Sequence, residues 1–436
     1  MKRKHLISTL CSLLLALSLC MALAVPGFAA TEEKNAVVKA AAAEGLNVKD
    51  FINELSKSAV KGLFAGGSGT KADPWQITNA DQLNAMRFRP HDHFILCNDV
   101  DLSGVAHWTP IGLFIPADME METAGTTFAF TGELDGNGKT ISNFRTSSVQ
   151  PMGCALFGIT SGNASIHDLT MKDANVTGLL YVASLVGMAS GNTKLQNLTL
   201  TGDNNIKGLM YVGGLVGGGS NKLNKNLTAT ANVTLTARGL MEDLNAQAVG
   251  VLYGGAEECN FENCKVLGGT VTATGNKINS IGGLAGCAHQ SGYLKNCTVQ
   301  NVTIKVANAE LVGGLVGAAG NNEGLKKNAK RTVLSGNTVK NVKIIADKDA
   351  NRIGMLSGGG FYTAATKSTF SKPGAFVLRD NNVSGTIQGG SLVGAVVGYK
   401  SANSVVKNNR TSVKWNGKTL TSAVGATTKT VPVSQL

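Results

Sequence analysis

Tyr211-Val-Gly-Gly-Leu-Val-Gly217 is one of eight related phrases that recur along this chain. Each phrase holds an apolar residue among small ones, and this central residue falls at positions 156, 185, 215, 252, 284, 315, 356 and 396. The steps between these positions are 29, 30, 37, 32, 31, 41 and 40 residues. A repeat with a period of this length predicts a solenoid, in which each unit stacks on the one before it.

A second phrase follows the first in most units, as in Leu195-Gln-Asn-Leu-Thr-Leu200 and Leu294-Lys-Asn-Cys-Thr-Val299. These runs are short, apolar and partly β-branched, and Gly, Asn, Ser and Thr separate them, which is typical of strands and turns. A helical repeat would need longer runs, and the glycines of the first phrase interrupt any such run. The sequence therefore predicts an all-β fold, a parallel β-helix of about eight repeat coils.

Asn197, Asn263 and Asn296 hold the centre of the second phrase in three units. In a stack of coils these side chains would lie about 4.8 Å apart, which allows each amide to bond its neighbour. Asn also tolerates the left-handed backbone of a sharp corner. We therefore predict a structural ladder. The alternative is N-glycosylation, because Asn197-Leu-Thr, Asn296-Cys-Thr and Asn301-Val-Thr fit the acceptor pattern.

The Gly-Gly-Leu-Val-Gly phrases resemble the GLUG motif of bacterial cell-surface proteins. Gly67-Ser-Gly-Thr-Lys-Ala-Asp-Pro-Trp-Gln-Ile77, Trp108-Thr-Pro-Ile-Gly112 and Phe130-Thr-Gly-Glu-Leu-Asp-Gly-Asn-Gly-Lys-Thr-Ile141 are similar to the coils that such proteins place before their repeats. The resemblance covers roughly residues 66 to 410 and implies a right-handed parallel β-helix of pectin-lyase-like shape. It implies no catalytic residue, since the family shares none.

The first 29 residues read as a secretory signal peptide. A basic start precedes a long apolar core, and Gly27-Phe-Ala29 fits the small-x-small pattern for cleavage after Ala29. An uncleaved membrane anchor is the alternative, because the apolar core is long. No second apolar span follows, so we expect a secreted or cell-surface protein with no transmembrane domain after signal removal.

Three further regions follow the signal peptide. Residues 30–65 are expected to form a short helical segment, which could cap the open first coil or serve as a tether. Residues 66–145 are expected to form the opening coils, with one short helix begun by the capping box Asn79-Ala-Asp-Gln82. Residues 146–436 are expected to form the repeat β-helix.

Six of the eight cysteines lie beyond the signal peptide. Their spacing is not that of a small disulfide-stapled domain, although export permits disulfides. Cys264 and Cys297 hold the same place in successive units, two residues before Val266 and Val299. We predict that both are small apolar side chains of the core, with a disulfide as the alternative.

Charge is unevenly distributed along the chain. Residues 31–140 carry 9 Lys and Arg against 15 Asp and Glu, whereas residues 141–436 carry 28 against 13. A local basic cluster consists of Lys326, Lys327, Lys330 and Arg331, which we predict as the binding residues. A basic solenoid on an exported protein favours anionic partners such as an acidic polysaccharide, a cell-wall polymer or a host glycan. The alternative is that scattered lysines keep a long β surface soluble.

Gly132-Glu-Leu-Asp-Gly-Asn-Gly-Lys139-Thr140 imitates a phosphate-binding loop, but five residues separate Gly132 from Gly138 where four are required. No helix is expected after it, so we interpret Asp135-Gly136 and Asn137-Gly138 as turns and predict no nucleotide.

His91, His93 and His107 lie close together in sequence, and His91 and His93 would share one strand face. An exposed loop rich in His explains them without a metal, so we assign no metal site and no cofactor. Asp99 and Asp101 also share a strand face at a spacing near that of glycosidase carboxylates, but we expect them to serve turns or salt links in the opening coils. Tyr181 and Tyr211 hold equivalent places and could stack.

The sequence therefore favours a secreted or surface-held binding or adhesion protein with no catalytic residues. The alternative function is a polysaccharide lyase or glycoside hydrolase of the β-helix type, and a purely structural envelope component is a third. A cluster of carboxylates contributed by several coils to one face would favour the enzyme. The acidic residues after position 140 do not recur in phase, which argues against such a cluster.

Overall fold

The structure is a computed structural model of the 436-residue chain. It describes residues 63–106, 108–115, 126–147, 152–236, 247–275, 278–289, 292–320, 331–360 and 375–428. The chain divides into two compact units, Met1–Ser68 and Gly69–Leu436, and every helix and strand given below belongs to the second. The predicted signal peptide, and the predicted helical segment up to residue 62, lie outside the described residues.

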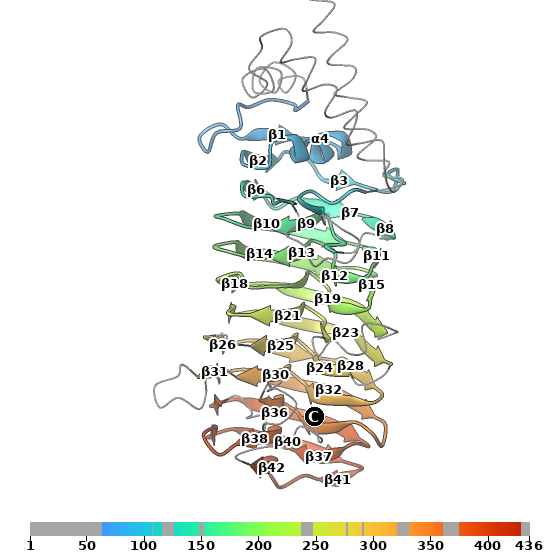
Figure 1. The fold of residues 1–436 in the computed structure, drawn as a ribbon, viewed down its shortest axis with the longest axis vertical. Helices are drawn as coiled ribbons and strands as arrows, with labels where there is room; N and C mark the ends of the chain where they lie inside the picture. The colour runs from blue at the N-terminus through green and yellow to red at the C-terminus, as the bar shows by residue number, and fades with distance from the viewer. Residues whose placement is uncertain are drawn as a thin grey trace, which may run out of the picture. The chain divides into compact units, whose positions relative to one another are not determined.

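The second unit is a stack of coils in which each strand pairs with equivalent strands of the neighbouring coils (Figure 1). Val186, for example, pairs in parallel with Phe157 on one side and with Val216 on the other. Strands joined in this way form three long sheets of 24, seven and nine strands. The predicted parallel β-helix is confirmed.

The 24-stranded sheet contains one or more strands from every coil. Its strands are β1 (Trp75–Ile77), β2 (His93–Leu96), β3 (Val100–Asp101), β6 (Glu133–Asp135), β7 (Thr140–Ser142), β8 (Arg145–Ser147), β10 (Ser165–Lys172), β11 (Asn175–Thr177), β14 (Lys194–Thr201), β15 (Asn205–Gly208), β18 (Leu223–Lys225), β19 (Thr228–Thr236), β22 (Asn260–Glu262), β23 (Lys265–Thr274), β26 (Tyr293–Lys295), β27 (Thr298–Gln300), β28 (Val302–Val306), β31 (Thr332–Ser335), β32 (Thr338–Ala346), β35 (Phe376–Arg379), β36 (Asn382–Gln388), β39 (Val405–Lys407), β40 (Arg410–Trp415) and β41 (Lys418–Thr419).

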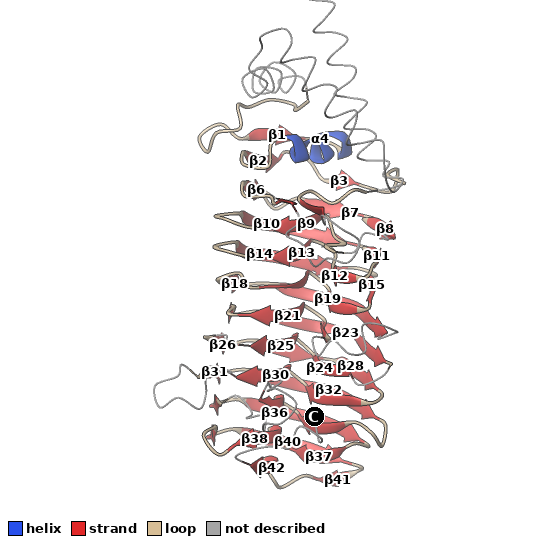
Figure 2. Cartoon of the chain, in the orientation of Figure 1, coloured by secondary structure: helices blue, strands red, loops and turns tan. Residues whose placement is uncertain are grey.

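Two further parallel sheets complete the coils from β9 onward (Figure 2). The seven-stranded sheet is β12 (Leu180–Val182), β16 (Met210–Gly213), β20 (Ala248–Gly250), β24 (Ile278–Gly282), β29 (Ala309–Gly313), β33 (Asn351–Gly354) and β37 (Ser391–Gly394). The nine-stranded sheet is β9 (Phe157–Thr160), β13 (Val186–Ala189), β17 (Val216–Gly219), β21 (Tyr253–Glu257), β25 (Ala285–His289), β30 (Val316–Gly320), β34 (Ser357–Gly360), β38 (Val397–Ser401) and β42 (Val424–Thr428). The remaining elements are the antiparallel pair β4 (Leu113–Ile115) and β5 (Thr126–Phe128), the helix α4 (Ala80–Ala85) and the 3₁₀ turn η1 (Met86–Phe88).

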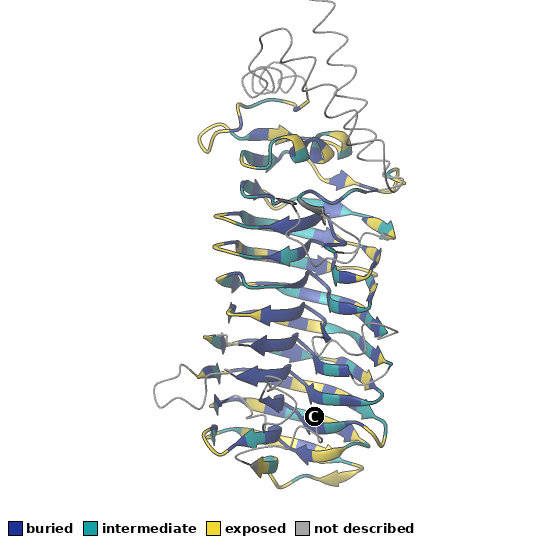
Figure 3. Ribbon diagram, viewed as in Figure 1, coloured by how far each residue is buried: buried dark blue, intermediate teal, exposed yellow. Residues whose placement is uncertain are grey.

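The core lies inside the coils and is built from the central residues of the repeated phrase (Figure 3). All eight are completely buried: Leu156, Leu185, Leu215, Leu252, Leu284, Leu315, Leu356 and Val396. The glycines beside them are required by close backbone approach. A Cβ added at Gly213 would lie 2.0 Å from the Val216 carbonyl oxygen, so no larger residue fits there.

The predicted ladder is present in part: Asn197 and Asn263 belong to one hydrogen-bonded run, whereas the Asn296 side chain has no bond to Asn263 among the described residues. Asn197, Asn263 and Asn296 have positive φ angles of 52°, 55° and 55°, as a left-handed corner requires. Asn197 and Asn263 are not direct neighbours, however, because Asn226 lies between them. The Asn226 amide donates to Asn197 Oδ1 at 2.8 Å, and the Asn263 amide donates to Asn226 Oδ1 at 3.4 Å. At the other end of this run, Asn197 donates to Asp168 Oδ1 at 2.9 Å.

The residue after each corner points into the core. Cys264 and Cys297 hold this place in two successive coils, and both are completely buried free thiols, so the predicted core role is confirmed. Asn337, Asn381 and Asn409 hold it in the last three coils and form a second ladder that the sequence did not predict. Asn381 Nδ2 donates to Asn409 Oδ1 at 2.8 Å, and Asn337 Nδ2 donates to Asn381 Oδ1 at 3.0 Å.

The opening coils confirm three local predictions. Asn79 caps α4, because its side chain accepts the Gln82 backbone N–H. Asp101 Oδ1 accepts the Ser103 N–H at 2.9 Å and so serves a turn, as predicted. Asp99 Oδ1 instead accepts the Thr140 N–H at 2.8 Å, a bond between successive coils, and Asp101 also accepts such a bond from Asn143. The segment between β6 and β7 is a coil corner with no helix after it.

Candidate functional site

Among the described residues, most Lys and Arg belong to strands of the 24-stranded sheet. Its strands from β14 to β41 contain thirteen Lys and Arg and a single carboxylate, Glu262. The thirteen are Lys194, Lys207, Lys225, Lys265, Lys295, Lys305, Lys340, Lys343, Arg379, Lys407, Arg410, Lys414 and Lys418. All except Lys225, which is half-buried, are exposed to solvent. Inward positions of these strands must be apolar, so their charged residues lie on the outer face.

One group of these cations, which we call the C-terminal basic face, consists of Lys340 and Lys343 on β32 and Arg410 and Lys414 on β40. Lys343 and Lys414 are both in register with Thr386 of the strand between them. They therefore stand two strand spacings, or about 10 Å, apart. No carboxylate of the described residues forms an ion pair with any of the four, so their charges stay available to a ligand.

Of the four residues in the basic cluster predicted from the sequence, the structure describes only Arg331. Lys326, Lys327 and Lys330 lie outside the described residues. Arg331 is exposed and immediately precedes β31.

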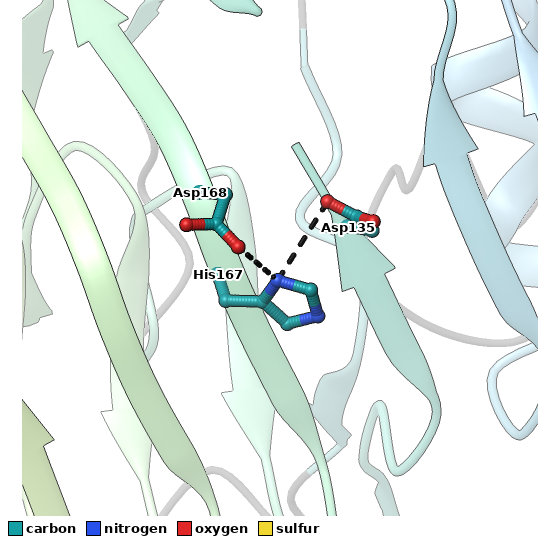
Figure 4. Close-up of side chains that lie close together, drawn as sticks. All are labelled: Asp135, His167 and Asp168. Carbon is teal, nitrogen blue, oxygen red and sulfur yellow. Dashed lines mark hydrogen bonds and ion pairs between the residues drawn. The ribbon is translucent and has the colours of Figure 1, made fainter. Parts of the chain in front are cut away.

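The first coils present the opposite charge on this sheet. His167 Nδ1 lies 2.8 Å from Asp168 Oδ2 and 3.6 Å from Asp135 Oδ1. Dashed lines mark both contacts in Figure 4. Glu133 Oε1 lies 4.0 Å from His167 Nε2 and 3.5 Å from His93 Nδ1. We call these five residues the acid–histidine cluster. They come from the adjacent strands β2, β6 and β10, because Asp135 pairs with His167 and Glu133 pairs with His93.

The geometry of the acid–histidine cluster allows two kinds of chemistry. Asp135, His167 and Asp168 each offer one ligand atom within 4.8 Å of the others, so these three residues could hold a divalent cation. They could also act as paired carboxylates, since a cavity of about 420 Å³ adjoins Asp135 and Asp168. The hydrogen bond from His167 lowers the pKa of the Asp168 carboxyl, and the Asn197 amide acts in the same direction against the effect of burial. Asp168 is therefore ionised at neutral pH.

The predicted histidines do not gather into one site. His91 Nδ1 lies 2.6 Å from Thr131 Oγ1, His93 belongs to the acid–histidine cluster, and His107 lies outside the described residues. The sequence analysis missed Glu133, Asp135, His167 and Asp168 as a group, because it compared acidic residues only after position 140. Aligning Glu133-Leu-Asp135 with Ser165-Ile-His167 would have brought them together, since the two segments are in register.

Comparison with known proteins gives partial matches. No family model matches the chain, so the resemblance to the GLUG motif stays a prediction. Halomucin from Haloquadratum walsbyi is 32% identical over 141 residues, which is 31% of this chain and 2% of that protein. A proposed Gly-rich membrane protein from Evansella cellulosilytica is 30% identical over 137 residues, which is 30% of this chain and 14% of that protein. The matches therefore span a small part of both relatives.

Among solved structures, a proposed immunoglobulin A1 protease from Bacteroides ovatus aligns over 84% of this chain and 86% of that one. The TM-score is 0.42 and the identity is 17%, a likeness that assigns no function. In the described part of the chain, no helix has the length and apolar character to cross a membrane.

Proposed function

We propose that this protein is an exported, non-catalytic binding protein that holds an anionic glycopolymer on the outer face of the 24-stranded sheet. An acidic polysaccharide, a cell-wall polymer or a host glycan has the required chemistry. The observation that carries the proposal is the ratio of thirteen basic residues to one carboxylate in the strands from β14 to β41.

In a β-helix, side chains at equivalent positions of successive coils line up along the stack. Neighbouring strands lie about 4.8 Å apart, so cations in the same register form a line along the stack that can meet the repeated charges of a polymer. A single exposed ion pair contributes only about 0.2–1 kcal/mol, and therefore binding depends on several contacts made together. The C-terminal basic face supplies four such contacts within three adjacent strands of the sheet.

Export is part of this proposal. The basic start, long apolar core and small residues before Ala30 support a cleaved signal peptide. The names of the two relatives, a halomucin and a Gly-rich membrane protein, agree with a place at or outside the cell surface. We also propose that the repeats belong with the GLUG motif, on the sequence resemblance alone.

A binding measurement with polygalacturonate tests the proposal. The variant replaces Lys340, Lys343, Arg410 and Lys414 by Gln, and its affinity is compared with that of the parent. The loss of four exposed contacts is expected to weaken binding by about fivefold to several hundredfold.

A matched control removes the same amount of charge elsewhere. Lys71, Lys222, Lys348 and Lys400 lie outside the strands of the 24-stranded sheet, and replacing them by Gln is expected to change the affinity by less than about threefold. Equal losses in the two variants would assign binding to net charge and contradict a specific face.

A second candidate function is glycan cleavage, which the acid–histidine cluster favours. Asp135 and Asp168 come from different coils and adjoin a cavity, and their ligand atoms lie within 4.8 Å. Retaining glycosidases likewise use two carboxylates that lie close together, roughly 5–5.5 Å apart. This function would be established if the parent protein released reducing ends from polygalacturonate and the variants Asp135→Asn and Asp168→Asn did not. Absence of release at high protein concentration would leave the binding proposal in place.

A further inference from the structure

A cavity of about 230 Å³ opens between the seven-stranded and nine-stranded sheets, away from the strands that carry the basic residues. Its walls come from several successive coils. The lining residues used below are Tyr211, Ala248, Glu257, Ser280, Cys287 and His289.

Two tyrosines stack at one end of this cavity. The rings of Tyr181 and Tyr211 are nearly parallel, with centroids 4.8 Å apart and an interplanar angle of 17°, as the sequence suggested. Glycines of the nine-stranded sheet make room for them. A Cβ on Gly218 would lie 3.1 Å from the Tyr181 ring, and one on Gly255 would lie 2.3 Å from Cδ1 of Tyr211.

The stack ends where the next coils carry small residues. Tyr211 precedes Val212, which pairs with Val249, so Ala248 holds the equivalent place in the following coil. Ala248 in turn pairs with Ser280. In the facing sheet Gly218 pairs with Gly255, and Gly255 pairs with Cys287. The column of rings therefore stops at Tyr211, and short side chains follow it along the wall of the cavity.

Polar groups surround this space. Ser280 is 1% exposed, and its hydroxyl has no hydrogen-bond partner among the described residues. A buried hydroxyl is normally satisfied by protein or water, so a guest that carries a hydrogen-bonding group could take the place of water at Ser280. His289 Nδ1 lies 3.5 Å from Glu257 Oε1, and the Glu257 side chain is 59% exposed, which places a carboxylate near the mouth.

We propose that this cavity binds one uncharged pyranose ring of a glycan, with a C–H face of the sugar against the tyrosine stack and sugar hydroxyls on Ser280 and Glu257. A cavity of about 150 Å³ is enough for benzene, so 230 Å³ accommodates one six-membered ring with its hydroxyls.

The chemistry of the walls selects this class of ligand. A purely aromatic guest could stack on Tyr211 but would leave the Ser280 hydroxyl without a partner. An acidic sugar would meet the Glu257 carboxylate. Burial also raises the pKa of the Tyr211 phenol well above its usual range, so the stack itself stays neutral. The ligand is therefore distinct from the anionic polymer of the basic face, and this inference does not rest on the proposed function.

Titration of the full exported chain with uncharged sugars tests the inference. Glucose, galactose, mannose, N-acetylglucosamine and their short oligomers are used as probes, with glucuronate as the acidic comparator, and binding is followed by calorimetry and saturation-transfer NMR. We expect at least one uncharged probe to bind, with an affinity that is unchanged between low and high salt and is stronger than that for glucuronate. Binding of no uncharged probe, or a preference for glucuronate, would overturn the proposal.

Two variants locate the binding. Ala248→Phe fills the cavity and is expected to abolish binding, with its fold checked by circular dichroism. Ser280→Ala removes one hydroxyl of small volume and is expected to weaken binding by roughly fivefold, the value of one net hydrogen bond. The variant of the C-terminal basic face should bind the sugar like the parent. Parental affinity in Ala248→Phe or in Ser280→Ala would place the sugar elsewhere and contradict the assignment.

Discussion

Asp168 belongs both to the run of corner residues and to the acid–histidine cluster. Its left-handed backbone, with φ of 54°, begins the run of corner residues that continues through Asn197, and its carboxylate belongs to the acid–histidine cluster. Bonds from His167 and from Asn197 both lower the pKa of this carboxyl. A carboxyl with a lowered pKa in the folded state contributes stability above its unfolded pKa of about 3.9, and this contribution is lost as the pH falls through the folded value.

Asp168→Asn is expected to flatten the acid dependence of stability. Asn holds the same corner place at Asn197 and Asn226, so the substitution keeps the backbone conformation and removes only the titrating group. Chemical denaturation between pH 6 and pH 2 should show a smaller loss of unfolding free energy in the variant than in the parent. The same loss in both proteins would mean that the interactions of Asp168 do not contribute to stability.

Asn381→Ala is expected to destabilise the fold by at least about 2 kcal/mol, because it leaves buried groups without partners. Asn381 Oδ1 accepts from the backbone and the side chain of Asn337, and Asn381 Nδ2 donates to the Leu334 carbonyl oxygen at 3.0 Å. Urea denaturation measures the change.

Asn197→Gly is the matched control for the buried ladder. Asn197 is exposed, and Gly336 shows that glycine is accepted at a corner, with φ of 66°. We expect a cost below about 1 kcal/mol, since water can replace the lost side-chain bonds. A cost for Asn197→Gly equal to that of Asn381→Ala would contradict the distinction between outer and inner ladders.

At the residue scale, the sequence predicts the backbone conformation of a residue better than it predicts whether the side chain is buried. The corner role of Asn197, Asn263 and Asn296 follows from the tolerance of Asn for left-handed backbone. The buried ladder of Asn337 and Asn381 does not follow, because the place after each corner holds Leu or Cys in earlier coils, and a polar residue there looks exposed in a single sequence.

At the scale of the strand and turn, the glycines of the repeated phrase allow neighbouring coils to stack closely. Gly213→Ala would place a Cβ 2.0 Å from the Val216 carbonyl oxygen and 2.6 Å from the Gly254 nitrogen. Backbone cannot move aside at both contacts, so we expect a loss of at least about 3 kcal/mol. Gly104→Ala, which meets nothing within 4 Å, should change stability by no more than about 0.5 kcal/mol. Similar denaturation midpoints for the two variants would contradict close stacking as the reason for the phrase.

Element order was predictable, whereas the register between coils was not. Alternation of apolar and polar residues and the recurring glycines identify the strands. The acid–histidine cluster depends instead on the pairing of Asp135 with His167, and coils in this chain differ in length by more than ten residues. A fixed period cannot align such coils, and for this reason the cluster and the tyrosine cavity emerged only from the structure.

On the scale of the whole β-helix, charge changes sign along one sheet. Carboxylates gather on β3, β6 and β10, and cations dominate from β14 onward. The sequence showed this asymmetry as a difference between residues 31–140 and 141–436, but it could not show that the later cations share one face. That common face is what makes multivalent binding of a polymer physically plausible, because isolated surface charges are screened and individually weak.

The salt dependence of polygalacturonate binding tests the central claim most directly. The screening length falls from about 10 Å at 0.1 M salt to about 3 Å at 1 M, so binding through the basic face should weaken steeply over this interval. The variant that replaces Lys340, Lys343, Arg410 and Lys414 should start weaker and show a shallower dependence. Affinity that stays constant from 0.1 M to 1 M salt, or equal slopes for parent and variant, would contradict the account.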